Sequence, residues 1–149
     1  MWLRNMRGLR VIKDGRCIGR VVQGCLCDSL TMLDGFWADR MLFGIRFISS
    51  EHICVLGKSS ILVDHPGERL RMKPQTLFIR SVSTDGKRFG AVIDAEIDER
   101  TYRVNRLAVN TGWFDRLTHG LLLVSGFTYD HASERLIIGQ YETETEVET

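Results

Sequence analysis

The chain contains 149 residues, of which 44% are apolar and 26% charged, and its formal net charge at pH 7 is +1. This near-neutral balance excludes a global field that would draw the whole protein to nucleic acid or to an anionic membrane surface. No apolar run approaches the ~18 residues of a membrane-spanning helix, and residues 1–8 lack the apolar stretch of a secretory signal peptide. We therefore expect a cytoplasmic protein without a membrane span.

One sequence pattern occurs twice and organises the rest of the chain. A turn dipeptide, Asp14-Gly15, is followed by a second glycine four residues on and by alternating small apolar residues up to residue 26. The same pattern returns at Asp85-Gly86, at an offset of 71 positions (86 − 15). After a five-residue insertion in the second copy, 110–114, the matches continue at an offset of 76. A fixed offset with one insertion predicts a duplicated module.

Each copy is expected to form a series of short strands. Alternation and composition predict strands in the first copy at residues 9–12, 18–27, 30–37, 45–48 and 60–63. Residues 49–53 are expected to form one helical turn capped by serine. The corresponding strands of the second copy are expected at residues 89–98, 101–109, 121–124 and 135–138. The Asp-Gly dipeptides are typical hairpin turns, so the sequence predicts an all-β protein.

The long second strand of each copy alternates between apolar and polar residues. In the first copy Val22 is expected to face inward and Gln23 outward. In the second copy the residues expected to face inward are Phe89, Ala91, Ile93, Ala95 and Ile97, and those expected to face outward are Asp94, Glu96 and Asp98. Small residues on the inner face suit a sheet that coils into a narrow barrel.

Composition divides the chain into four parts. The two copies are assigned to residues 1–64 and 76–140, and the charged stretch between them, 65–75, holds both prolines and is interpreted as a linker. The tail, 141–149, alternates threonine and glutamate after its first tyrosine and has almost nothing to bury. We expect this acidic tail to be disordered.

The order of motifs in the first copy resembles the PRC-barrel family. The motifs are Gly8-x-x-Val11, Asp14-Gly15-x-x-Ile18-Gly19-x-Val21, a run from Phe47-Ile48-Ser49-Ser50-Glu51-His52-Ile53 to Leu56-Gly57, and Ile61-Leu62-Val63. The resemblance covers nearly all of the first copy and covers the second more loosely, because Ser133 stands opposite Gly57. It implies two tandem small PRC-like β-barrels.

In function, the resemblance implies a bacterial docking or assembly module and no enzyme. The family includes the cytoplasmic barrel of the photosynthetic reaction centre H subunit and the C-terminal barrel of the ribosome-maturation factor. We expect neither the membrane helix of the first nor the different N-terminal barrel of the second. The chain therefore looks more like the stand-alone tandem PRC-barrel proteins, and fold alone does not settle their function.

The candidates for a metal site are Cys25 and Cys27, with Cys17 and Cys54 as the remaining cysteines. Cys25 and Cys27 share one face of the second strand, so a two-thiolate metal or redox site is conceivable. A structural zinc site needs four ligands, however, and the second copy contains no cysteine. We interpret them as reduced cytosolic thiols and expect no cofactor.

Catalytic signatures are absent from the sequence. The four histidines are scattered over different loops, and there is neither a Gly-x-Ser-x-Gly elbow nor a phosphate-binding glycine loop. The carboxylates Asp94 and Glu96 are interpreted as residues on the solvent-exposed face of a strand. We therefore expect no enzymatic activity.

The inserted loop of the second copy carries the candidate protein-binding residues, Trp113 and Phe114. Large aromatic residues on a loop are typical anchors for a protein partner. The alternative is that they fold back to plug the barrel or to seal the contact between the copies. The leading hypothesis is an adaptor that binds a protein partner or itself.

An RNA- or ribosome-associated assembly factor is the alternative function. It is suggested by an arginine cluster near the N-terminus, formed by Arg4, Arg7, Arg10, Arg16 and Arg20. No aromatic stacking motif accompanies these arginines, so solvated surface charge is the simpler interpretation.

Overall fold

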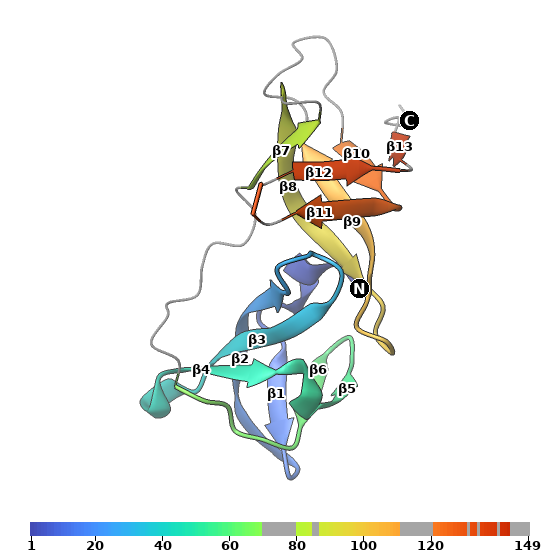
Figure 1. Cartoon of the computed structure of the whole chain (residues 1–149). Coiled ribbons are helices and arrows are strands. Elements are labelled where there is room, and N and C mark those ends of the chain that lie inside the picture. The colour runs from blue at the N-terminus through green and yellow to red at the C-terminus, as the bar shows by residue number, and fades with distance from the viewer. Residues whose placement is uncertain are drawn as a thin grey trace. The chain divides into compact units, whose positions relative to one another are not determined.

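The computed structural model describes residues 1–69, 80–84, 87–110, 121–130, 132–133, 135–139 and 141–143. Strands dominate this part of the chain (Figure 1). Its helices are three 3-10 turns, η1 (Leu3–Met6), η2 (Met41–Phe43) and η3 (Ser50–His52). Over these residues, no helix is long and apolar enough to cross a membrane. The expectation of an all-β protein is confirmed at this level.

The chain divides into two compact units. Unit 1 consists of Met1–Gln75 together with Ile97–Val104, and unit 2 consists of Thr76–Glu96 together with Asn105–Thr149. The main boundary lies next to the expected end of the linker, at residue 75. The segment Ile97–Val104, which the sequence repeat assigns to the second copy, belongs to unit 1 by its contacts.

Unit 1 is built on a six-stranded sheet. Its strands are β1 (Arg10–Lys13), β2 (Arg16–Leu26), β3 (Leu33–Asp39), β4 (Ile45–Ser49), β5 (Ile53–Leu56) and β6 (Ser60–Val63), in the order β4-β3-β2-β1-β6-β5. The β1–β2 hairpin turns at Asp14 and Gly15, which both have positive φ, 51° and 74°. Two positive φ angles define the turn that matches the twist of a hairpin. Fully buried core side chains come from four of these strands: Val11, Phe36, Ile48 and Ile61.

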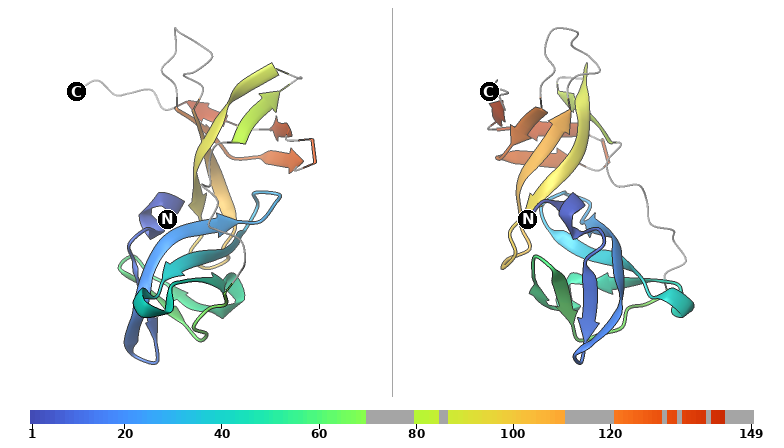
Figure 2. Two further views of the ribbon diagram at one scale, coloured as in Figure 1. Left: turned by 90° about the vertical axis from the view of Figure 1, so that its left-hand side faces the viewer. Right: turned by 180° about the vertical axis from the view of Figure 1, so that it is seen from behind.

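Unit 2 repeats the same order of strands. Its strands are β7 (Arg80–Thr84), β8 (Lys87–Ile97), β9 (Val104–Asn110), β10 (Leu121–Val124), β11 (Phe127–Asp130), β12 (Arg135–Ile138) and β13 (Tyr141–Thr143). The order β10-β9-β8-β7-β12-β11 corresponds strand by strand to unit 1, and β13 is added beside β10. Figure 2 shows β8, the long yellow-green strand, curving along its length. The core includes Val92, Leu107, Val109, Val124 and Leu136.

Neither sheet closes into a barrel over the described residues. In unit 1, β4 and β5 lie at opposite ends of the sheet, and the chain passes from one to the other through η3 without a hydrogen-bonded ladder between them. In unit 2, β13 and β11 occupy the two ends. The coarse expectation of β structure holds, and the expected closure is not seen in these residues.

The alternation expected for β2 holds at Gly24 and Leu26 but is wrong at Val22 because of a β-bulge. The register between β2 and β3 shifts between Val21 and Gln23, so two residues of β2 oppose one of β3 and the buried face changes. The buried residues of β2 are Gly19, Val21, Gly24 and Leu26. Val22, expected to be inward, is only half-buried.

The buried face of β8 changes at the equivalent place. Its buried residues are Gly90, Val92, Asp94, Ala95 and Ile97. Ile93, expected inward, is 41% exposed, and Asp94, expected on the wet face, is only 3% exposed. The backbone N–H of Ala95 donates to Asp94 Oδ1 at 2.9 Å. This bond gives the buried carboxylate a partner where the strand changes face.

The segment after the last strand of each repeat covers the edge of the fourth strand. In unit 1, Phe47 of β4 and Glu68 exchange two backbone hydrogen bonds of 2.9 and 2.8 Å. In unit 2, β13 pairs antiparallel with β10. The expected linker at 65–75 therefore starts as part of unit 1. The expected disorder of the tail is wrong for Tyr141–Thr143, and residues 144–149 lie outside the described part.

The turn between β2 and β3 pairs with the tip Ile97–Val104 inside unit 1. The N–H of Leu33 donates to the carbonyl of Tyr102 at 2.8 Å, and the N–H of Val104 donates to the carbonyl of Thr31 at 2.9 Å. Residues 31 and 102, and residues 33 and 104, are each 71 positions apart. Equivalent turns of the repeat therefore pair reciprocally at this point.

Candidate functional site

An apolar turn protrudes from unit 1 between β3 and β4. Its three residues, Met41, Leu42 and Phe43, form η2 and have exposed fractions of 83%, 99% and 62%. Ile45, which starts β4, is also exposed. Scattered apolar residues on a surface are ordinary, but a contiguous set is typical of a binding surface. We refer to Met41–Phe43 as the apolar turn.

Hydrogen bonds hold the apolar turn in one conformation. Asp39 Oδ1 accepts the backbone N–H of Met41 at 2.9 Å. The backbone N–H of Arg40 donates to the carbonyl of Gly44 at 3.0 Å, and the N–H of Phe43 donates to the carbonyl of Arg40 at 3.1 Å. The Arg40 guanidinium lies 5.1 Å from the centroid of the Phe43 ring, a cation–π distance. The apolar side chains are thus presented by an ordered turn.

Met41 has a backbone conformation that is unusual for its residue type. Its φ is +54°, in the left-handed region where a side chain beyond Cβ costs of order 1 kcal/mol. Non-glycine residues held in this region often mark functional sites. Met41 therefore combines an unfavourable backbone conformation with a highly exposed apolar side chain.

Sequence reasoning missed the apolar turn and selected the equivalent loop of the other repeat. Asp39-Arg40-Met41 corresponds to Asp115-Arg116-Leu117 at the offset of 76, so the turn matches the loop that carries Trp113 and Phe114. Those two aromatic residues lie outside the described residues. The available signal was that both repeats place large apolar residues between their third and fourth strands.

The structure places Cys25 and Cys27 in different surroundings. Cys25 lies in β2 opposite Gly35 of β3, and its thiol contacts the carbonyl of Leu26 at 3.8 Å. Cys27 follows β2, and its Sγ lies 3.3 Å from Ser29 Oγ and 3.5 Å from Thr31 Oγ1. None of the four cysteines is in a disulfide. The two thiols share no hydrogen-bond partner in these contacts.

The turn around Cys27 favours its thiolate. Burial opposes ionisation, but hydrogen bonds from the hydroxyls of Ser29 and Thr31 and from backbone groups of Met32 and Thr31 outweigh it. Together they lower the pKa of Cys27 from 9.0 to about 7. A reactive thiol requires such an environment, whereas a metal site requires further ligands. No group of three or more potential metal ligands is found in the described part of the chain.

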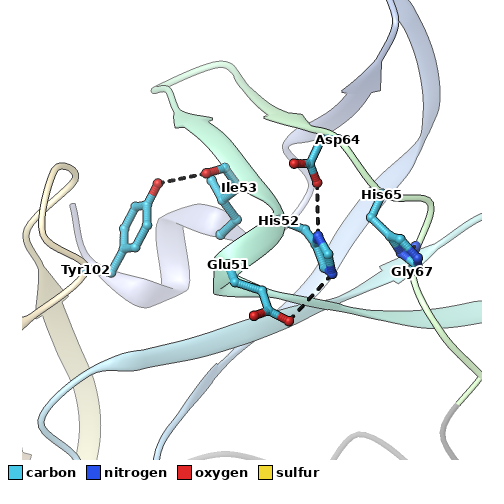
Figure 3. Close-up of polar contacts among 7 residues, drawn as sticks. All are labelled: Glu51, His52, Ile53, Asp64, His65, Gly67 and Tyr102. Carbon is cyan, nitrogen blue, oxygen red and sulfur yellow. Dashed lines mark hydrogen bonds and ion pairs between the residues drawn. The ribbon is translucent and has the colours of Figure 1, made fainter.

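Two histidines stack beside the end of β6 (Figure 3). The rings of His52 and His65 are 4.5 Å apart between centroids, with an interplanar angle of 22°. His52 Nδ1 lies 3.0 Å from Asp64 Oδ1, and its Nε2 lies 3.6 Å from Glu51 Oε1. Stacked rings do not direct their nitrogen lone pairs to one point, so this pair is not arranged to share a metal ion.

The chain after His65 passes tightly over β4. Gly67 has φ +92°, and a Cβ at this position would lie 2.9 Å from Arg46 Cβ and 2.9 Å from Ile48 Cγ1. Both facts require glycine. The next residue, Glu68, makes the bridge to Phe47. We call residues 64–69 the strap, because they cover the edge of β4.

The N-terminal arginines are partly used by the fold. Arg7 Nε donates to the carbonyl of Val22 at 3.2 Å, and Arg20 Nη1 donates to the carbonyl of Gly8 at 3.0 Å. Arg10 stands directly opposite Arg20 in the β1–β2 ladder. These contacts fix two of the five side chains to backbone carbonyls, which does not favour an RNA site over surface charge.

No protein-family model matches the chain, and no curated protein matches its sequence. A function for this chain therefore has to be inferred from its own residues and contacts.

Proposed function

We propose that this protein is a non-enzymatic adaptor that binds a protein partner through the apolar turn Met41–Phe43. The observation that carries the proposal is the exposure, between 62% and 99%, of three consecutive large apolar side chains on an ordered turn. Removing such side chains from water supplies about 25 cal/mol for each Å² of apolar surface buried. An ordered turn also loses little conformational entropy on binding.

The proposal includes two copies of a PRC-barrel-like module. Support comes from the shared strand order of the two sheets and from the motif order of the first repeat. In each unit the segment that follows the sixth strand pairs with the fourth strand. We interpret this shared arrangement as one module used twice, with the loop between its third and fourth strands as the contact surface.

Direct binding to a purified partner tests the proposal. Proteins retained by the full chain from host lysate, with and without RNase, would be identified, purified and titrated against the chain by calorimetry. We expect the triple variant Met41→Ser/Leu42→Ser/Phe43→Ser to bind at least tenfold more weakly, because anchor residues carry most of an interface's energy. Ile137→Ser, on an exposed apolar residue of β12, is the matched control and should bind as the wild type does.

Other outcomes identify the alternatives. Retention of ribosomal components that disappear with RNase would favour the RNA-associated function. A concentration-dependent dimer abolished by the triple variant would make the partner a second copy of this chain. Full binding by a folded triple variant would refute the apolar turn, and Trp113→Ala/Phe114→Ala would then test the equivalent loop.

A further inference from the structure

We infer that the strap is an acid-released cover of the β4 edge, with His65 as its proton sensor. The backbone of residues 64–69 is held over β4 by a small number of contacts, and one of them requires a neutral imidazole. Release of the strap by acid does not depend on whether the apolar turn binds a partner.

The contact between His65 and Gly67 defines the protonation state of the closed strap. The backbone N–H of Gly67 donates to His65 Nδ1 at 3.0 Å. Since an N–H is always a donor, Nδ1 must be unprotonated, and the ring carries its proton on Nε2. A proton added to Nδ1 would replace this hydrogen bond with two opposed N–H groups. Proton binding by His65 and closure of the strap therefore compete.

The stacked partner of His65 increases this competition. His52 faces two carboxylates, Asp64 at the start of the strap and Glu51 on η3. With His52 protonated, a positive charge on His65 would lie 4.5 Å away, ring against ring. Histidine changes charge between about pH 5 and 8. Two protonated rings at this separation would repel each other in the closed strap.

The charged groups around the pair cannot replace the lost bond. Besides Glu51 and Asp64, which face His52, Arg46 on β4 packs against Gly67 through its Cβ, and its guanidinium Nη1 donates to the carbonyl of Ile45 at 3.4 Å. Glu68 is exposed, and its backbone is held by Phe47. Acid therefore weakens the segment that leads into the bridge while leaving the bridge atoms themselves unchanged.

Opening would expose a strand edge. The strap satisfies the outward N–H and carbonyl of Phe47 through Glu68. Once the strap leaves, β4 presents these groups to water or to another extended chain. Unit 2 has no such latch in its described residues, since β13 covers the equivalent edge by a ladder of three residue pairs.

The test is amide exchange of the full chain at pH 7.5 and pH 5.0, measured by NMR and expressed as protection factors. Glu68 and Phe47 report the bridge. Val21, which donates to the carbonyl of Leu9 at 2.9 Å, reports the global stability of unit 1. The range stops at pH 5.0 because carboxylic acids ordinarily gain protons below it. In the wild type we expect the protection of Glu68 to fall about tenfold on acidification, with Val21 little changed.

Two substitutions of His65 separate the effect of its hydrogen bond to Gly67 from the effect of ring packing. His65→Asn places a neutral oxygen acceptor two residues before the Gly67 N–H, the geometry of an Asx turn, and should keep Glu68 protected at both pH values. His65→Phe keeps a stacked ring without an acceptor and should leave Glu68 weakly protected at both. His52→Gln removes the neighbouring imidazole ring and should reduce the acid effect without abolishing it.

The opposite results would overturn the inference. Wild-type protection at Glu68 that is equal at both pH values would show that the strap does not sense protons. A tenfold loss in His65→Asn equal to that of the wild type would mean that another group is the sensor. A parallel loss at Val21 would show that acid acts on the whole unit and not on the strap.

Discussion

Unit 1 and unit 2 arrange the same six strands in the same order, yet they cover the equivalent edge in different ways. In unit 2 the edge of β10 is covered by β13, which pairs with it through three residues. In unit 1 the edge of β4 is covered by a strap with one bridge, a glycine that fits against β4 and a histidine that holds the turn. An edge strand needs a cover, and this comparison shows that the cover can change while the sheet is retained.

Equivalent positions inside the sheets also differ in chemistry. Cys25 and Gly35 face each other across β2 and β3, and the residues 71 positions later are Glu96 and Arg106, which form an ion pair. Two residues further along the chain, Cys27 corresponds to Asp98. Both are anchored by their turns: Asp98 accepts two backbone N–H groups, and Cys27 contacts two hydroxyls. The backbone geometry is shared, and the side chains set the difference.

The largest expected effect tests whether the two sheets are packed alike. A Cβ added to Gly19 would clash with the carbonyl oxygen of Asp39, and one added to Gly90 would lie 2.5 Å from the carbonyl oxygen of Asn110. Gly90 lies 71 positions after Gly19, and Asn110 lies 71 positions after Asp39, so the two contacts are equivalent in the repeat. Gly19→Ala and Gly90→Ala should each destabilise their own unit by about 2 kcal/mol, since a backbone carbonyl cannot move aside cheaply.

Urea unfolding followed at amide resonances of each sheet would measure the two effects. Gly8→Ala is the control, because a Cβ there meets nothing within 4 Å and adds only the cost of its positive φ. A large loss from Gly19→Ala with none from Gly90→Ala would contradict equivalent packing of the two hairpins.

The second prediction concerns the bulge positions of β2 and β8. Asp94 is buried and accepts the N–H of Ala95, whereas the equivalent Gln23 is only half-buried. Asp94→Ala leaves a buried donor without this acceptor and should cost about 1–3 kcal/mol of unfolding free energy. Gln23→Ala should cost less than about 1 kcal/mol. Thermal unfolding of the two variants would test the order, and equal losses would show that burial of Asp94 does not matter.

Sequence patterns located many strands but not the features that distinguish the units. β6 and β12 lie where alternation places them, at 60–63 and 135–138. In the structure, the buried residues of β2 are Gly19, Val21, Gly24 and Leu26, and one step in this series is three residues instead of two. A prediction that assumes strict alternation cannot show such a bulge.

Three other features had no signal in the local sequence. The strap depends on Phe47, about twenty positions earlier in the chain, so its charged and proline-containing sequence was interpreted as a linker. The sequence of the apolar turn is equally consistent with a buried segment, because composition cannot distinguish a buried Met-Leu-Phe run from an exposed one. Residues 53–56 were not expected to be a strand, yet β5 forms there by pairing with β6.

The third prediction tests whether the Cys27 turn is built for an anion, as the Asp98 turn is. Because hydrogen bonds lower the pKa of Cys27 to about 7, roughly half of its thiol is ionised at neutral pH. Cys27 should react with iodoacetamide several-fold faster at pH 7 than the exposed Cys17 and Cys54, with a midpoint near pH 7. Mass spectrometry of labelled peptides measures the rates.

Removal of the two hydroxyls provides the control for this thiol. Ser29→Ala/Thr31→Ala takes away the side-chain donors and should raise the pKa of Cys27 and slow its labelling at pH 7. Cys27→Asp should fold, because a carboxylate already occupies the equivalent turn at Asp98. An unchanged labelling rate in the double variant would contradict the role of the hydroxyls.

The smallest expected effect distinguishes the ion pair of unit 2 from the Cys25–Gly35 pair of unit 1. Arg106 Nε donates to Glu96 Oε2 at 2.6 Å, and this bond holds the pKa of Glu96 below its ordinary value. The folded unit therefore favours the carboxylate, and its contribution is present above the ordinary acid range and is lost as pH falls through the lowered pKa. Glu96→Gln should cost about 0.5–1 kcal/mol at pH 7, the range of a partly exposed pair. That cost should shrink below about pH 4. Unfolding of unit 2 compared at pH 7 and pH 3.5 measures it, and a cost that persists at pH 3.5 would mean that the glutamate stabilises β8 by packing and not by charge.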